Sequence, residues 1–157
     1  MERVAIFVDV QNIYYTVKQN YNRHFNYNAF WADVTSKREV IKAIAYAIDK
    51  GDKHQIQFQQ ILKRIGFEVK LKPFIQRSDG SSKGDWDIGI TLDMIDYVKE
   101  VDVVVLASGD GDFALAIDKI RNEYNVLVEV YGVPKLTAPS LIGSATKFIP
   151  IEKNLLL

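Results

Sequence analysis

Short, strongly apolar segments that alternate with helical patterns restrict the fold of this chain more than any other feature of its sequence. Arg3–Val10, Val101–Ala107 and Val126–Val133 are rich in valine, as strands buried on both faces of a sheet are. Each is followed by a segment of helical character. Strands that alternate with helices predict a parallel sheet covered on both faces and joined by right-handed crossovers. The expected fold is therefore α/β, a three-layer domain with a central, mainly parallel sheet.

The remaining segments fit the same alternation. Glu39–Ile48 is compatible with a strand or a helix, and we expect a strand because a strong turn follows it. Phe67–Ile75 alternates apolar and charged residues, which is typical of a half-exposed edge strand. We expect helices beginning near Gln11, at Lys53–Ile65, at Ile88–Val98, from Phe113 and at Leu136–Ala145, a loop at Ser78–Ser82, and a last strand at Lys147–Ile151. No boundary interrupts this pattern, so residues 1–157 are expected to form a single domain.

The composition excludes several classes of protein. The chain has 157 residues and no cysteine, so disulfides and thiolate metal sites are excluded. No segment approaches the roughly 18 apolar residues of a membrane span, and the N-terminus lacks the long apolar stretch of a signal peptide. A soluble, cytoplasmic protein is expected, and its oligomeric state is left open.

Charge is balanced overall but unevenly distributed. The 20 basic and 20 acidic residues cancel, which argues against broad non-specific binding of nucleic acid. Residues 50–83 are mostly basic, whereas residues 84–118 are acidic with Lys99 as their only base. Ordinary solvated helix faces would explain the basic segment equally well.

The first candidate for chemistry is Asp9, at the carboxyl end of the first predicted strand. Sites in open α/β sheets form outside the carboxyl ends of strands. A carboxylate at this place can bind a cation, and Asn12 can point at the same spot one short turn later. Both residues would also serve as ordinary helix caps.

The second candidate is the segment Ser108-Gly109-Asp110-Gly111-Asp112-Phe113, which leaves the most apolar strand. Asp110 and Asp112 are separated by one glycine, which suggests a bent backbone that turns both carboxylates to one place. Asp112 alone could instead cap the helix that opens at Phe113. A cap needs only one side chain, so the pair favours a site.

The third candidate precedes the helix at Ile88. Asp87 is expected in its first turn and Asp85 just before it, where an aspartate is favourable without any function. Asp93 lies further along that helix, so we expect it behind the residues that contact the ion, or in solvent. Lys83 could meet a phosphate, although an exposed loop lysine is the commoner case.

Taken together, these residues predict a metal site. If the first strand and Val101–Ala107 are neighbours, Asp9 and Asp110 face each other across a crevice. Several carboxylates that close repel one another unless a cation binds or a proton is retained. A set of oxygen ligands without Cys or His suits Mg²⁺ or Mn²⁺ rather than Zn²⁺. Such a site would activate water, which points to cleavage of a nucleic-acid phosphodiester.

In order and spacing, Asp9, Asn12, Lys83, Asp87, Asp93 and the Ser108–Phe113 element resemble the NYN domains of the PIN-like nuclease superfamily, in particular the LabA-like branch. The likeness spans Val4 to about Ile151. It implies a PIN-like, Rossmann-like sheet with its first and fourth strands central, and a metal-dependent ribonuclease that binds RNA.

The resemblance also implies roles for individual residues. The metal ligands and catalytic residues would be Asp9, Asp87, Asp110 and Asp112, with Mg²⁺ or Mn²⁺ as the cofactor. Asn12 and Ser108 would orient water or substrate, and Lys83 would contact phosphate. Lys83 and Asp87 are four positions apart, rather than about three, so Asp85 is an alternative ligand. Asp87 is preferred, because Asp87 and Asp93 keep the spacing of the family.

Two other functions compete with this one. A non-catalytic regulatory or RNA-binding protein would keep the fold, and the neutral net charge favours it modestly. A phosphatase of the haloacid dehalogenase type needs Asp-x-Asp after the first strand, where this chain has Asp9-Val10-Gln11. A receiver domain needs an acidic pair there, which is also absent.

Overall fold

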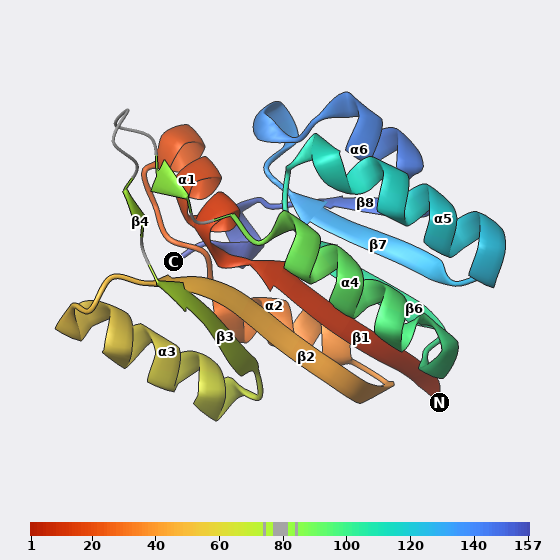
Figure 1. The fold of residues 1–157 in the computed structure, drawn as a ribbon, viewed down its shortest axis with the longest axis horizontal. Helices are drawn as coiled ribbons and strands as arrows, with labels where there is room; N and C mark the ends of the chain where they lie inside the picture. Colours follow the sequence, from red (N-terminus) through yellow and green to blue (C-terminus); the bar gives the residue numbers. More distant parts are fainter. Residues whose placement is uncertain (74, 77–81, 84) are drawn as a thin grey trace.

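Six parallel strands form the central sheet (Figure 1). The computed structural model describes residues 1–73, 75–76, 82–83 and 85–157. The strands are β1 (Glu2–Asp9), β2 (Arg38–Asp49), β3 (Glu68–Pro73), β6 (Val103–Ala107), β7 (Leu127–Gly132) and β8 (Lys147–Pro150), in the order β3-β2-β1-β6-β7-β8. A separate antiparallel pair is formed by β4 (Ile75–Gln76) and β5 (Ser82–Lys83).

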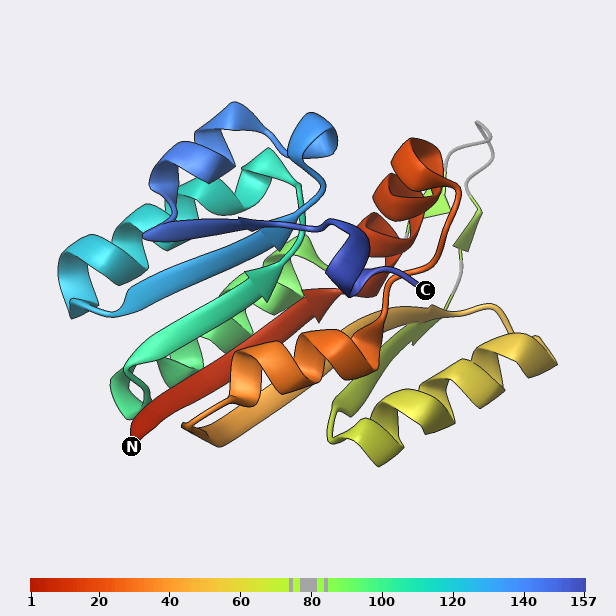
Figure 2. The ribbon, with the colours of Figure 1, turned by 180° about the vertical axis from the view of Figure 1, so that it is seen from behind.

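Helices cover both faces of this sheet (Figures 1 and 2). One face carries α1 (Val10–Tyr21), α2 (Tyr27–Thr35) and α3 (Lys53–Ile65); the other carries α4 (Asp87–Tyr97), α5 (Ala114–Tyr124) and α6 (Pro139–Ser144). Short 3-10 segments are η1 (Val98–Glu100), η2 (Gly111–Phe113), η3 (Pro134–Leu136) and η4 (Lys153–Leu155). None of the described helices is both long and apolar enough to span a membrane.

The apolar runs of the sequence become the central strands because these strands are buried on both faces. In β1, Val4, Ile6 and Val8 pack on the side of α1 and α2, whereas Ala5 and Phe7 pack on the side of α4 and α5. No side of the strand meets water, so alternation of polar and apolar residues is absent.

The order in which strands are added to the sheet reverses between β1 and β6. From β1 it proceeds outward through β2 to β3, then crosses with α4 to β6 on the other side of β1. Val8 of β1 pairs with Ala107 of β6, so Asp9 and Ser108 leave the sheet side by side. This is the topological switch point at which α/β sheets form their sites.

The predicted fold class is confirmed, and so are the central positions of the first and fourth strands of the sheet. Glu39–Ile48 is a strand, as expected, and Phe67–Ile75 contains the edge strand β3. The predicted loop at Ser78–Ser82 lies, apart from Ser82, outside the described residues.

Two elements differ from expectation. The aromatic segment after α1 contains the helix α2, which Asn26 caps by accepting a hydrogen bond from the Ala29 N–H at 3.0 Å. The single helix expected over Leu136–Ala145 is divided into η3 and α6, and α6 begins at Pro139. The proline ring keeps Ala138 extended, which prevents a continuous helix.

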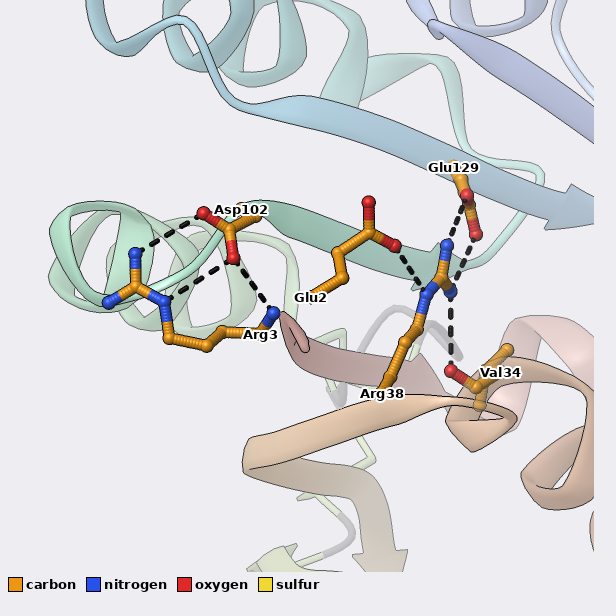
Figure 3. A network of polar contacts seen from close by, with 6 residues as sticks. All are labelled: Glu2, Arg3, Val34, Arg38, Asp102 and Glu129. Carbon is orange, nitrogen blue, oxygen red and sulfur yellow. Dashed lines mark hydrogen bonds and ion pairs between the residues drawn. The ribbon is translucent and has the colours of Figure 1, made fainter.

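Charged side chains join four segments at the amino end of the sheet (Figure 3). Arg38 of β2 donates to both carboxylate oxygens of Glu129 on β7, at 3.1 and 2.7 Å, and to Glu2 of β1 at 2.8 Å. Arg3 donates to Asp102, just before β6. The Arg38–Glu129 pair is mostly buried, with side-chain exposures of 15% and 17%, so solvent screens it only partly.

Replacing Arg38 with Met should lower the free energy of unfolding by about 2 kcal/mol, because Glu129 would keep a partly buried charge without its partner. Equilibrium unfolding in urea measures this change. Lys119→Met is the matched control: it removes an exposed ion pair with Glu123 and should leave the unfolding midpoint unchanged. Equal midpoints for both variants and the parent would contradict the assigned role of Arg38.

Candidate metal centre

Asp9 is a buried carboxylate at the carboxyl end of β1, with an exposed fraction of 8%. Its Oδ2 accepts a hydrogen bond from the Ser108 hydroxyl at 3.1 Å, and its Oδ1 accepts one from the Asn12 N–H at 3.5 Å. Asp9 therefore caps α1 and also contacts the segment that follows β6.

Two polar contacts join the end of β1 to the segment that follows β6. The Ser108 hydroxyl donates to Asp9 and accepts from the Asp110 N–H at 3.2 Å. The Asn12 side-chain carbonyl accepts from the Gly109 N–H at 2.8 Å. Ser108 and Asn12 therefore hold the backbone of Gly109 and Asp110, which positions the Asp110 carboxylate.

The glycines of this segment are required by a close neighbour. A Cβ on Gly109 would lie 2.6 Å from the Leu136 carbonyl oxygen, and one on Gly111 would lie 2.8 Å from Ala138 Cβ. Neither glycine has a positive φ. The Gly109 carbonyl also accepts from the Ala138 N–H at 3.0 Å, so the chain between β7 and α6 packs directly on this loop.

Asp110, rather than Asp112, caps the segment that opens the next helix. Its Oδ1 accepts from the Asp112 N–H at 2.9 Å at the start of η2. Asp112 is thereby freed from the capping role that its sequence position allowed, and its side chain is exposed.

Asp87, Asp110 and Asp112 converge at this edge of the sheet. Each offers a carboxylate oxygen, and these three atoms lie within 4.8 Å of one another. Asp87 comes from the first turn of α4, and the other two come from the segment after β6. Asp85 and Asp9 are not part of this triple among the residues that the structure describes.

Crowding changes the acidity of two of these carboxyls. Burial raises the pKa of Asp87 to about 8, with further contributions from a hydrogen bond to Asp110 and from the charges of Asp110, Asp85 and Asp9. Burial also raises the pKa of Asp9 to about 6, against the opposing effect of the Ser108 hydrogen bond. At neutral pH, Asp87 retains a proton when no cation is present.

This donor set fits a hard divalent cation. Two ionised carboxylates about 5 Å apart would repel by about 3 kcal/mol at an effective dielectric near 20, and a divalent ion would replace that repulsion with attraction. The ligands are all oxygens and one of them is exposed, which leaves room for water and substrate. Asp87, Asp110 and Asp112 are thus the residues that could hold Mg²⁺ or Mn²⁺.

The other residues singled out in the sequence have different surroundings. Asp93 accepts from the Tyr46 hydroxyl at 2.6 Å and pairs with Lys70 at 2.8 Å, away from the triple. Asp85 is exposed and acts on Asp87 and Asp9 through its charge. The backbone of Lys83 lies in β5, and its side chain is outside the described part of the chain.

One lysine that the sequence does not single out lies near the centre. Lys72, near the end of β3, donates from Nζ to the Asp85 carbonyl at 3.1 Å. In the sequence it belongs to Lys63–Arg77, a basic segment that could also serve as a phosphate track along an edge strand, in which no single lysine stands out. Its register opposite Ile48 of β2, close to the site, depends on strand pairing.

Comparisons with known proteins agree with this geometry. The NYN domain family model matches residues 3–152. The chain belongs to the NYN-domain family. The NYN family is part of the PIN-like nuclease superfamily, whose nucleases generally use divalent metal ions.

Named relatives support the same assignment. The NYN domain is 34% identical to the low amplitude and bright protein LabA of Synechococcus elongatus, over 96% of this chain and 84% of that protein. A crystal structure of a protein of unknown function from Vibrio parahaemolyticus superimposes with a TM-score of 0.95 and 54% identity, covering 99% of this chain and 96% of that one. Ribokinase from Giardia lamblia, at 13% identity and a TM-score of 0.52, shares the fold alone.

The raised pKa values predict how stability varies with pH in the metal-free NYN domain. Between an unfolded value near 4 and the folded pKa of about 8, the folded state keeps an Asp87 proton that the unfolded state has lost. Stability from this group is complete below about pH 4 and is lost as pH rises through about 8. Asp87→Asn should therefore raise the melting temperature relative to the parent at pH 8.5, and much less at pH 5.

Thermal unfolding in the presence of a chelator measures this difference. Asp118→Asn, an exposed aspartate on α5, is the control and should show no such dependence on pH. A parallel offset at both pH values for Asp87→Asn would mean that the Asp87 carboxyl is not crowded.

Proposed function

We propose that this NYN domain is a Mg²⁺- or Mn²⁺-dependent ribonuclease that hydrolyses phosphodiester bonds at the aspartate cluster. The observation that carries the proposal is the convergence of Asp87, Asp110 and Asp112 within 4.8 Å at the switch point of the sheet. Membership of the NYN family supports it. Capping explains Asp110, and a helix N-terminus favours Asp87, one residue at a time. Their convergence with Asp112 remains unfavourable unless a cation binds or a proton is retained.

The proposed roles follow from the positions of the side chains. Asp87, Asp110 and Asp112 would hold the cation, and Asp9 would add a fourth negative charge from its buried position. Ser108 and Asn12 would keep Asp110 in place through the contacts described above. The proposed contact of Lys83 with phosphate concerns a side chain that the structure does not describe.

Each group then contributes to hydrolysis in a defined way. A bound Mg²⁺ or Mn²⁺ would supply a water of lowered pKa and charge stabilisation for the phosphoryl oxygens. Asp87 would lose its proton when the site is loaded, because the positive charge favours the carboxylate form. The exposed Asp112 would leave part of the cluster open to water and substrate.

Cleavage of RNA tests the proposal. Purified protein should cut single-stranded RNA with Mn²⁺ or Mg²⁺ and stop when a chelator is added. Asp9→Asn and Asp110→Asn should each lower the rate at least about a hundredfold while circular dichroism remains that of the folded parent. Asp118→Asn, outside the cluster, should cut at the parental rate. Equal cleavage by the Asp110→Asn variant and the parent would identify a contaminating nuclease and overturn the proposal.

A non-catalytic, RNA-binding or regulatory role is the second candidate, favoured by the neutral net charge of the chain. Titration calorimetry with Mn²⁺ separates the two. The parent should bind Mn²⁺ and release protons near pH 7, because the Asp87 carboxyl is protonated there. Asp87→Asn should weaken binding at least about tenfold and abolish most of the proton release. Mn²⁺ binding by the parent without cleavage of any RNA tested would select the regulatory role.

A further inference from the structure

Lys72 is positioned beside the segment that delivers Asp87. It lies near the carboxyl end of the edge strand β3, where it pairs in register with Ile48. Its Nζ donates to the Asp85 carbonyl at 3.1 Å and lies 4.5 Å from the centroid of the Trp86 ring. The ammonium therefore contacts a residue, Asp85, that lies two positions before the proposed metal ligand Asp87.

Lys72 differs from the neighbouring lysines on the same face of the sheet in the partners of its ammonium group. Lys70 pairs with Asp93 at 2.8 Å, and Lys42 pairs with Glu68 at 3.3 Å. In the described ranges, no carboxylate lies within ion-pair distance of Lys72. An ammonium carries three N–H donors, and the Asp85 carbonyl accepts one of them.

The indole of Trp86 makes a rigid support for this ammonium. Its Nε1 donates to the Ala47 carbonyl at 2.8 Å, and its ring packs against Tyr46 with a centroid distance of 5.2 Å. A Cβ on Gly89 would lie 2.7 Å from the ring, so the glycine allows the indole to lie directly on α4. A cation over a fixed indole face is held in place before any ligand arrives.

The opposite flank of the cluster is unsuited to a polyanion. A hollow of about 520 Å³ lies between α4 and α5, and its lining includes Asp112, Asp118 and Glu123. Its lysine, Lys119, is already paired with Glu123 at 2.7 Å. Leu115, also in this lining, is an apolar residue that is 81% exposed. Of these two flanks, as far as the described residues form them, the β3 side gives a nucleic-acid strand the more favourable electrostatics.

We propose that Lys72, supported by Trp86, forms a phosphate-binding subsite for an RNA strand, one or two nucleotides from the bond cleaved at the aspartate cluster. The inference rests on the proposed function and extends it by naming the side from which the strand enters. Asp85 and Asp87 are two residues apart, which spans at most about 7 Å. The subsite therefore contacts a phosphate close to the reacting one.

Binding of RNA to a cleavage-deficient background tests this subsite. A fluorescein-labelled 12-nucleotide single-stranded RNA is titrated with the Asp9→Asn protein in Mg²⁺, and anisotropy is followed at several salt concentrations. Adding Lys72→Met, which keeps the aliphatic stem on the indole, should weaken binding about fivefold to tenfold and reduce the slope of log K against log salt by about 0.7. Lys72→Arg, which keeps the positive charge, should retain most of the parental affinity and most of the parental salt slope.

Two matched controls distinguish the subsite from a general effect of charge. Lys42→Met removes a paired lysine from the same sheet face, and Lys119→Met removes one from the acidic flank. Both should leave the salt slope unchanged. Melting temperatures verify that each variant folds. Trp86→Phe, which removes the hydrogen bond to the Ala47 carbonyl, should weaken RNA binding less than Lys72→Met does.

The possible results separate the inference from the proposed function. If the background protein binds RNA and Lys72→Met has the same affinity and slope, the subsite is refuted while the ribonuclease proposal stands. If Lys42→Met or Lys119→Met weakens binding as much as Lys72→Met, the effect is non-specific and the subsite is again refuted. If the background protein binds no RNA, the proposed function fails and the subsite with it.

Discussion

Pairing of β1 with β6 is the constraint on which the rest of the molecule depends. The register that places Val8 opposite Ala107 sets Asp9 beside Ser108, and the Ser108 hydroxyl then connects the Asp9 carboxylate to the Asp110 N–H. A shift of one residue would turn these side chains to opposite faces. The two buried cores hold the register, because each central strand contributes apolar side chains to both faces of the sheet. Packing energy thereby determines the position of charged groups that repel one another.

The carboxylate cluster is unfavourable by itself, and its surroundings differ on its two sides. Burial and mutual repulsion raise the pKa of Asp87 to about 8, so a proton takes the place that a cation would occupy. On the β3 side, Lys72 and the indole of Trp86 lie next to the cluster, whereas the α4–α5 side carries carboxylates and an exposed leucine. Among the described residues, this asymmetry favours approach of a polyanion from the β3 side over the α4–α5 side.

Much of the fold and part of the site could be predicted from local patterns. The valine-rich runs identified the central strands, and the boundaries of Lys53–Ile65 agree with those of α3. The division at Pro139 and the helix α2 were missed, because aromatic residues and a short capped helix give a weak periodic pattern. Asp110 and Asp112 were recognised as a pair, yet the glycines beside them are required by contacts with Leu136 and Ala138, which are distant in sequence.

Composition and local order were enough to specify an α/β chain and to mark the acidic residues at the ends of its strands, because strand burial and helix periodicity depend on neighbours in sequence. The folded arrangement was needed to show that Asp87, rather than Asp85, joins Asp110 and Asp112, and that Lys72 lies beside them. Those facts depend on crossover geometry and strand register. Both bring together segments that are far apart in sequence, and sequence separation does not give their distance in space.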